Sequence, residues 1–266
     1  MRKALRKAAR CRDVVDDMSR IYLINIGANT AHQNLARCPI FDGGGFVYVS
    51  FPDKDGRQNY PKEAEPFLFP KCPLNTHLDP DWKNVTYGDN CKNPRARALL
   101  QAKPNDILLF WALLWKNMST SWTGERGWYF IGAIRIEEIL EAGDSIAKAK
   151  FENRERTKNN AHIVGNRVVK DSGRIDRVFL GLKGNSTLFP KAVDLEIGKE
   201  DGLFQKAVRT SDGKKVNWNV SPRWNSVTRS CRAVWNLGIL EERQRANRVC
   251  DAIRQKNPDF DLLAGL

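Results

Sequence analysis

The first half of the chain contains four apolar segments whose patterns predict β-strands. RIYLINIGAN (20–29) and ILLFWALLW (107–115) are almost continuously apolar, which is typical of buried strands. GGGFVYVSFP (43–52) has an alternating pattern and is bounded by glycines at its start and by Pro52 at its end. WYFIGAIRIEEIL (128–140) is a longer apolar run. A polar, glycine-containing loop separates 107–115 from 128–140, so these two strands are expected to form a hairpin.

Helical patterns occur at three places. In NPRARALLQA (93–102), Asn93 can cap a helix and Pro94 would occupy its first turn. The strongly charged segment 144–160 and the segment 239–256 also have helical composition or spacing. The apolar face of the last helix is expected to consist of Ile239, Leu240, Val249 and Ile253, and Pro258 ends it.

The remaining segments complete an α+β pattern. Residues 53–84 are rich in Pro, Lys, Asp and Asn and predict a long irregular loop. Three short β-type runs follow at 161–168, 176–184 and 187–197. We therefore expect a curved mixed sheet or small barrel with helices around it, forming a single domain over residues 19–266 that ends in a helical region at 223–266. Residues 1–18 are expected to be a basic extension outside this domain.

The net charge of the chain indicates the kind of partner that it could bind. The 266 residues include 44 Lys and Arg against 31 Asp and Glu, which gives a net charge of +13 and a pI of about 9.6. Such an excess suits a polyanion, nucleic acid above all, although a generically basic surface would have the same composition. No run of about 18 apolar residues is present, so no membrane span is expected.

Metal and cofactor motifs are absent from the sequence. The six cysteines show no CxxC or Cys/His spacing, and with no secretory segment before them they are expected to be reduced thiols of a cytoplasmic protein. FDGGGF and GLKGNST lack the glycine spacing of a phosphate-binding loop and predict turns. His32, His77 and His162 are far apart in the chain and are expected to be polar surface or loop residues, so neither a metal nor a cofactor is predicted.

Aromatic residues give the clearest chemical signal. Trp111, Trp115, Trp122, Trp128 and Tyr129 fall within one short stretch. An indole can stack on a nucleobase, an interaction worth roughly 1–3 kcal/mol per base, but strand tryptophans are more often part of a core. Arginines near this stretch in the sequence could meet phosphates or simply form a solvated face. They are Arg95, Arg97, Arg126 and Arg135.

The order of these segments resembles that of known nucleic-acid-binding families. YLINIGAN, NPRARALLQAKPNDILLFWA and WYFIGAIRIEEI follow one another as the first strand, the helix–turn–strand unit and the glycine-containing strand do in the EVE and YTH families of the PUA-like superfamily. This resemblance implies a small β-barrel with flanking helices, which holds a modified or flipped base in an aromatic pocket beside a basic surface. It would place Trp111 and Trp122 against the base, Asn25 and Asn29 at its edge, and Arg95 and Arg97 on the backbone.

A second resemblance is closer. INIGANTAHQNLARCPIFDGGGF, VTYGD and NDILLFWA together are similar to the nucleotide modification associated domain families of phages and bacteria, over about residues 19–197. Two departures stand out, since Asn105 replaces the usual glycine of the turn and no aromatic cage can be matched residue by residue. Membership would imply association with DNA base modification systems, with a modification or restriction complex as a partner.

Three functions remain open from the sequence. The favoured hypothesis is a non-catalytic protein that recognises a base in nucleic acid, DNA rather than RNA, with Asn25, Asn29, Arg95, Arg97, Trp111, Trp122, Arg126 and Trp128 as its binding residues. The alternative is an enzyme that modifies or excises a base, for which Asp42, Asp89 and Asp106 are the nearest acids, although Asp at such turns is usually a turn former. In the third hypothesis the C-terminal helix docks onto a larger nuclease or modification complex.

Overall fold

The structure is a computed structural model that describes residues 18–56, 58–94, 96–118, 121–141, 151–164, 167–168, 173–195 and 233–264. Residues 1–17 of the expected basic extension, Arg95 and residues 223–232 of the expected C-terminal region lie outside the described residues.

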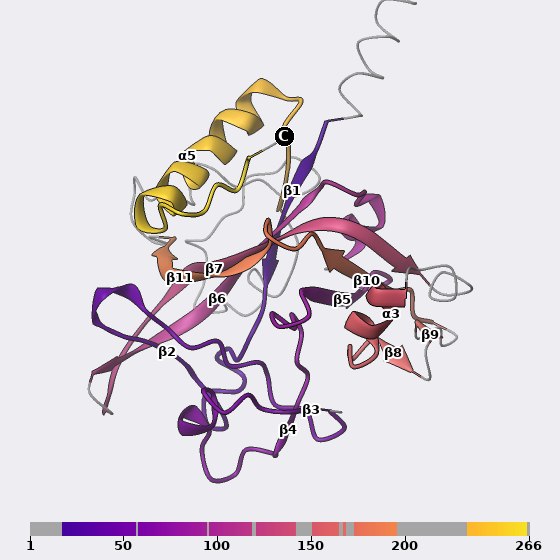
Figure 1. The fold of residues 1–266 in the computed structure, drawn as a ribbon. Helices are drawn as coiled ribbons and strands as arrows, with labels where there is room; N and C mark the ends of the chain where they lie inside the picture. The colour runs from indigo at the N-terminus through magenta and orange to yellow at the C-terminus, as the bar shows by residue number, and fades with distance from the viewer. Residues whose placement is uncertain are drawn as a thin grey trace, which may run out of the picture.

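An eight-stranded mixed sheet forms the centre of the fold (Figure 1). Its strands follow the order β12-β1-β6-β7-β10-β5, with β2 added beside β6 and β11 beside β7. Strands β1 and β6 are parallel, whereas β6 and β7 form the expected antiparallel hairpin. The strands are β1 (Arg20–Asn25), β2 (Cys38–Ile40), β5 (Thr86–Asn90), β6 (Ile107–Met118), β7 (Ser121–Glu141), β10 (Asp176–Gly181), β11 (Thr187–Asp194) and β12 (Ala233–Asn236).

Strand β6 is apolar from Ile107 to Trp115 because both of its faces are covered there. Alternate residues of a strand point to opposite faces. Leu108, Phe110, Ala112 and Leu114 belong to one buried cluster, while Ile107, Leu109, Trp111, Leu113 and Trp115 belong to another. The second cluster also includes Val249 and Ile253 of the C-terminal helix α5 (Leu240–Lys256), which lies along that face of the sheet (Figure 1).

Helix α5 confirms the helix expected near the C-terminus but corrects its apolar face. Val249 and Ile253 are fully buried, as expected. Ile239 and Leu240 are 42% and 59% exposed, so their assignment to the buried face was wrong. Ile239 is the N-cap residue of the helix and Leu240 its first residue.

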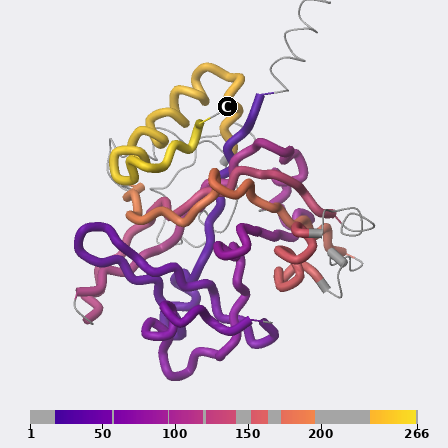
Figure 2. The backbone as a smooth tube through the Cα atoms, in the orientation of Figure 1, coloured from indigo at the N-terminus to yellow at the C-terminus, as the bar shows by residue number. Residues whose placement is uncertain are grey.

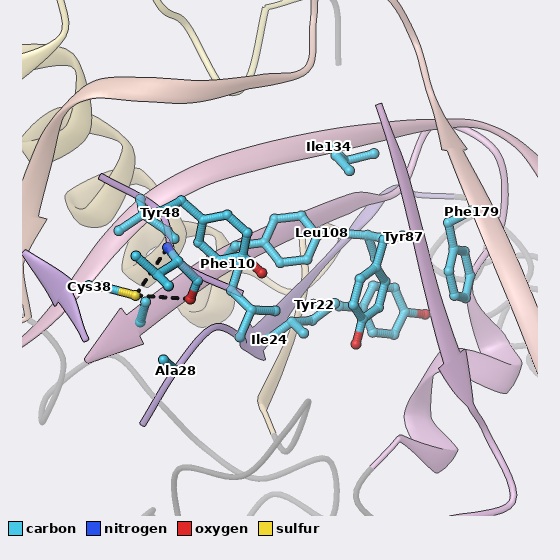
Figure 3. Packing of buried hydrophobic residues seen from close by; sticks show 14 of the residues in the cluster. Tyr22, Ile24, Ala28, Cys38, Tyr48, Tyr87, Leu108, Phe110, Ile134 and Phe179 are labelled. Atoms are coloured by element: carbon cyan, nitrogen blue, oxygen red, sulfur yellow. Dashed lines mark hydrogen bonds between the residues drawn. The ribbon is translucent and has the colours of Figure 1, made fainter. Parts of the chain in front are cut away.

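The opposite face of the sheet holds the larger cluster, shown in Figure 3. Tyr22 and Ile24 of β1, Phe110 of β6 and Tyr87 of β5 meet there. The Cys38 thiol donates a hydrogen bond to the Val49 carbonyl and accepts one from the Val49 N–H, at 3.2 and 3.4 Å. This contact joins the irregular part of the chain to the sheet.

The chain between β2 and β5 forms an irregular layer beside this second face (Figure 2). It contains the short 3₁₀ helices η1 (Asp42–Gly44) and η2 (Glu65–Phe67) and the two-residue strands β3 (Gln58–Asn59) and β4 (Asn75–Thr76). The segment 53–84, predicted to be a long irregular loop, includes β3, η2 and β4. The prediction of a strand over residues 43–52 was wrong. Gly43 and Gly44 have φ of +86° and +88°, which lie outside the β region.

The predicted helix at 93–102 is a shorter 3₁₀ helix, η3 (Arg97–Gln101). Its N-cap residue is Ala96, and the predicted cap residue Asn93 instead accepts the Ala96 N–H through its backbone carbonyl at 2.9 Å. The turn that follows contains Asn105 with φ of +72°. Asn is one of the few residues besides glycine that adopts this conformation readily, which explains its place in the turn.

Helix α3 (Phe151–Thr157) lies beside β10, as does the hairpin of β8 (Ile163–Val164) and β9 (Arg167–Val168). The helix falls within the predicted segment 144–160, whose first residues lie outside the described part of the chain. The loop from α3 to β8 carries Asn160 and His162 over β5: a Cβ atom on Gly88 would lie 2.4 Å from the His162 ring. This close approach of His162 to β5 lies in the wall of the cavity described below.

The fold class is α+β, mostly sheet with few helices. The predicted PUA-like barrel is not confirmed, because no pairing between β12 and β5 closes the sheet of described strands into a ring. Among the described helices, none combines the length and the apolar character required to cross a membrane.

Candidate functional site

An open cavity of about 460 Å³ lies beside the end of β1 and the middle of β5. Its volume is within the roughly 300–1,000 Å³ usual for small-molecule sites. Its lining residues are Asn25, Ile26, Gly27, Asn29, Ala31, His32, Phe51, His77, Asp79, Tyr87, Gly88, Asp89, Asn90, Asn93, His162 and Arg174. The lining is thus rich in amides, histidines and carboxylates, with two aromatic rings among them.

Three rings form a stack along one side of the cavity. Phe51 lies between His32 and His77, with ring centroids 5.7 and 4.7 Å apart and interplanar angles of 18° in both pairs. The His77 ring then meets the His162 ring edge to face, at 5.2 Å and 89°. The three histidines, which are far apart in the sequence, therefore share one cavity.

Asp79 occupies the centre of the polar part of the cavity. Its carboxylate is buried and accepts the Gly88 N–H, at 2.8 Å to Oδ1 and 2.9 Å to Oδ2. Asp79 Oδ2 also lies 3.4 Å from His162 Nε2 and 3.8 Å from His77 Nε2. Both imidazoles thus direct the same ring nitrogen towards one carboxylate oxygen.

Each of these histidines has a second carboxylate at its other ring nitrogen. His162 Nδ1 makes a short hydrogen bond with Asp176, a buried residue of β10. His77 Nδ1 lies 3.6 Å from Asp53 Oδ2. The result is a row of alternating groups, Asp53–His77–Asp79–His162–Asp176, and Arg174 clamps its last member with two 2.8 Å hydrogen bonds.

The pKa values follow from this row. Burial lowers the pKa of His162, but hydrogen bonds with Asp176 and Asp79 outweigh burial and raise that pKa to about 9. Burial lowers the pKa of His77, and nearby Asp79 opposes the effect only in part. Burial also raises the pKa of Asp79, whereas Arg174 and His162 overcome the effect of burial and lower the pKa of Asp176.

The structure divides the predicted base-binding residues between two places. Asn25 and Asn29 line the cavity, where the Asn25 amide donates to the Trp111 carbonyl at 3.3 Å and the Asn29 side chain accepts the Ala31 N–H at 2.9 Å. Trp111 and Trp128 do not line it. Their rings pack 5.4 Å apart inside the cluster beneath α5, on the opposite face of the sheet, and are 2% and 6% exposed.

Three more of the predicted residues, Arg97, Trp122 and Arg126, lie outside the cavity lining. Trp122 is half-buried, and the Arg37 guanidinium lies 5.4 Å from its ring centroid. Arg126 is exposed and covers Trp115 at 4.7 Å, while Arg97 is exposed at the beginning of η3. Arg95 lies outside the described residues. The predicted binding residues that the structure describes therefore do not form one site around the tryptophans.

Of the candidate acids, only Asp89 lines the cavity, where it accepts the Tyr87 hydroxyl at 2.8 Å. Asp106 is a turn former whose carboxylate accepts two backbone N–H groups, and Asp42 is an exposed residue of η1.

Sequence reasoning missed the most polar part of the cavity. Asp79 was not singled out, and His162, expected to be a polar surface or loop residue, lies in the loop between α3 and β8 but is only 6% exposed. One signal was present: His77 and Asp79 have the i, i+2 spacing that places two side chains on the same side of an extended segment. Nothing in the sequence pointed from this pair to His162.

Comparison with known proteins gives a family. Residues 20–247, more than half of the chain, match the model of the family described as nucleotide modification associated domain 3. No curated protein and no solved structure matches the sequence.

Proposed function

The chain belongs to the nucleotide modification associated domain 3 family, and from this premise we propose that its cavity binds a nucleobase, either flipped out of nucleic acid or carried by a nucleotide. The base would enter the cavity beside β1 and β5 rather than the tryptophan cluster. The chemistry of the cavity lining is the observation that carries this proposal.

Base recognition needs a flat apolar surface and groups that read the polar edge of the ring. Tyr87 and the stack of His32, Phe51 and His77 provide aromatic surface in the lining. Asn25 and Asn29 provide amides, which can both donate and accept. Histidine rings add further donors and acceptors. Extraction of a base costs a few kcal/mol, which such contacts can offset.

The charge of the chain supports nucleic acid as the source of the base. A net charge of +13 favours a polyanion, since phosphate contacts give affinity and base contacts give specificity. The cavity itself contains Asp79 and Asp89 with Arg174, so its lining is not the source of the positive charge. We propose that basic surface outside the cavity holds the backbone.

Isothermal titration with the deoxynucleoside monophosphates, and with single-stranded and duplex DNA carrying plain or modified bases, tests the proposal. At least one of these probes should bind the wild-type protein. Asn25→Ala should weaken its binding about tenfold, in line with the roughly 1–3 kcal/mol of a good base-edge contact. Asn59→Ala, which removes the same amide from an exposed residue of β3 outside the cavity, should leave affinity unchanged. The proposal fails if no probe binds or if the two variants behave alike.

A second function, an enzyme that modifies the base, is favoured by the Asp–His–Asp arrangement at the cavity wall. A carboxylate and an imidazole in hydrogen-bonding range are the groups that general acid–base catalysis uses. Mass spectrometry of nucleosides after incubation of DNA with the protein separates the two functions, because a binding protein returns every nucleoside unchanged.

A further inference from the structure

We propose that His77, Asp79 and His162 form a site for one divalent transition-metal ion in the wall of the cavity. One ligand atom from each of the three residues lies within 4.8 Å of the others. This inference goes beyond base binding and does not depend on what else the cavity holds.

The distances between the ligand atoms suit a metal ion. Asp79 Oδ2 lies 3.4 Å from His162 Nε2 and 3.8 Å from His77 Nε2. With metal–ligand bonds of about 2.0–2.2 Å, ligand atoms around one tetrahedral or octahedral ion are about 3–3.5 Å apart. The ligand atoms of His77 and His162 lie within 4.8 Å of each other, so a shift of the His77 ring by up to about 1 Å would bring all three atoms into range. His77 can supply it, because it is the most exposed of the three residues, with a 20% exposed side chain.

Both histidines are oriented as metal ligands usually are. A ligating imidazole commonly gives its second ring nitrogen to a carboxylate, which fixes the tautomer and the direction of the ring. Asp176 takes this role at His162 Nδ1, and Asp53 faces His77 Nδ1 at 3.6 Å. The Nε2 atoms of both rings are left directed towards Asp79.

The third ligand is held from the other side. The Gly88 N–H donates to both oxygens of Asp79, and the Tyr48 hydroxyl donates to the Asp79 backbone carbonyl at 2.9 Å. Each carboxylate oxygen has a second lone pair, so Asp79 can keep these contacts and still coordinate a cation. The carboxylates of Asp53, Asp79 and Asp176 make the surroundings favourable for added positive charge.

The donor set selects the class of ion. Two imidazoles and one carboxylate suit zinc, iron, cobalt or manganese, whereas magnesium and calcium prefer oxygen ligands throughout. Three protein ligands are also the number found in catalytic sites, where the remaining positions take water or substrate. All three residues line the cavity, so those positions would be accessible from it.

Titration of the chelator-treated full-length protein with Co²⁺, followed by visible absorption and calorimetry, tests the site without any nucleotide. One equivalent should bind and give the spectrum of a nitrogen- and oxygen-ligated cobalt ion, and Zn²⁺ should displace it. His77→Ala should lower the affinity at least tenfold, since loss of an outer-shell partner alone costs about 10–100-fold. Asp53→Asn, at a partly exposed outer residue, should give a smaller loss and serves if His77→Ala fails to fold.

His32→Ala is the matched control, because His32 stacks on the other side of Phe51 in the same cavity and is not a member of the triad. It should bind Co²⁺ as the wild type does. The proposal is overturned if the wild-type protein binds no ion at the one-to-one ratio, or if the His32 and His77 variants lose affinity equally. Failure here would leave nucleotide binding untouched, and the reverse also holds.

Discussion

Asp106 shows how a single carboxylate can be a structural link rather than a chemical group. It is 3% exposed, its Oδ1 accepts the Arg20 N–H at 2.7 Å, and its Oδ2 accepts the Lys103 N–H at 2.8 Å. Burial raises the pKa of this carboxyl. The side chain therefore ties the beginning of β1 to the turn that precedes β6.

Replacement of Asp106 by alanine should destabilise the protein by at least about 1–3 kcal/mol, the cost of leaving one buried donor without an acceptor. Asp42→Ala removes the same side chain from an exposed position and should change the free energy of unfolding by less than about 0.5 kcal/mol. Urea unfolding followed by circular dichroism measures both. Equal midpoints for the two variants would contradict the structural role of Asp106.

Gly88 leaves the space beside β5 that the His162 ring occupies at the cavity. A Cβ atom there would lie 2.4 Å from the His162 ring and 2.9 Å from the Asn160 amide oxygen, while Gly45 has no neighbour within 4 Å. Gly88→Ala should therefore displace His162 and weaken Co²⁺ binding about tenfold or more, as loss of a partner at a metal site does. Gly45→Ala should bind the ion normally. A Gly88 variant with wild-type affinity would show that His162 is not held in place by this contact.

Strand β6 shows why sequence analysis predicted the hairpin but could not place the tryptophans relative to the cavity. Its length and apolar content identify a buried strand, and the polar, glycine-containing loop before β7 identifies the turn. Because both faces are apolar, the pattern does not reveal which face adjoins a cavity. The strand's alternation places Trp111 and Trp115 on the face of the sheet that α5 covers in part, whereas the cavity adjoins the face that carries Phe110.

Trp111→Ala should thus reduce stability without altering the cavity. Replacement of a buried tryptophan by alanine lowers the free energy of unfolding by about 3–5 kcal/mol. Trp111 is 2% exposed and belongs to the same buried cluster as Trp128 and the apolar residues of α5. Trp122→Ala, at a half-buried ring, should cost less. Denaturant unfolding gives the stabilities, and Co²⁺ titration of the folded variants reports on the cavity. Loss of ion binding in a folded Trp111 variant would mean that the two faces of the sheet are coupled.

At the scale of the whole molecule, the site could not be read from the sequence because its parts meet only through the fold. His77 and Asp79 follow the short strand β4, His162 lies in the loop after α3, and neither neighbourhood carries a metal motif. Periodicity identifies elements that bury apolar residues, whereas the irregular layer from β2 to β5 has little periodicity to identify. Only the packing of this layer and the α3–β8 loop over β5 brings the three side chains together.

That arrangement predicts how an ion would affect the stability of the entire domain. An ion held by His77, Asp79 and His162 joins segments that separate when the chain unfolds, so it binds the native state preferentially. At a free concentration of one hundred times its Kd, such a ligand adds about 2.7 kcal/mol to the free energy of unfolding. The thermal midpoint of the chelator-treated protein should rise by several degrees when Zn²⁺ or Co²⁺ is added, and EDTA should reverse the change. His32→Ala should retain the increase and His77→Ala should lose most of it, whereas an equal increase in both would place the stabilising ion elsewhere on the protein.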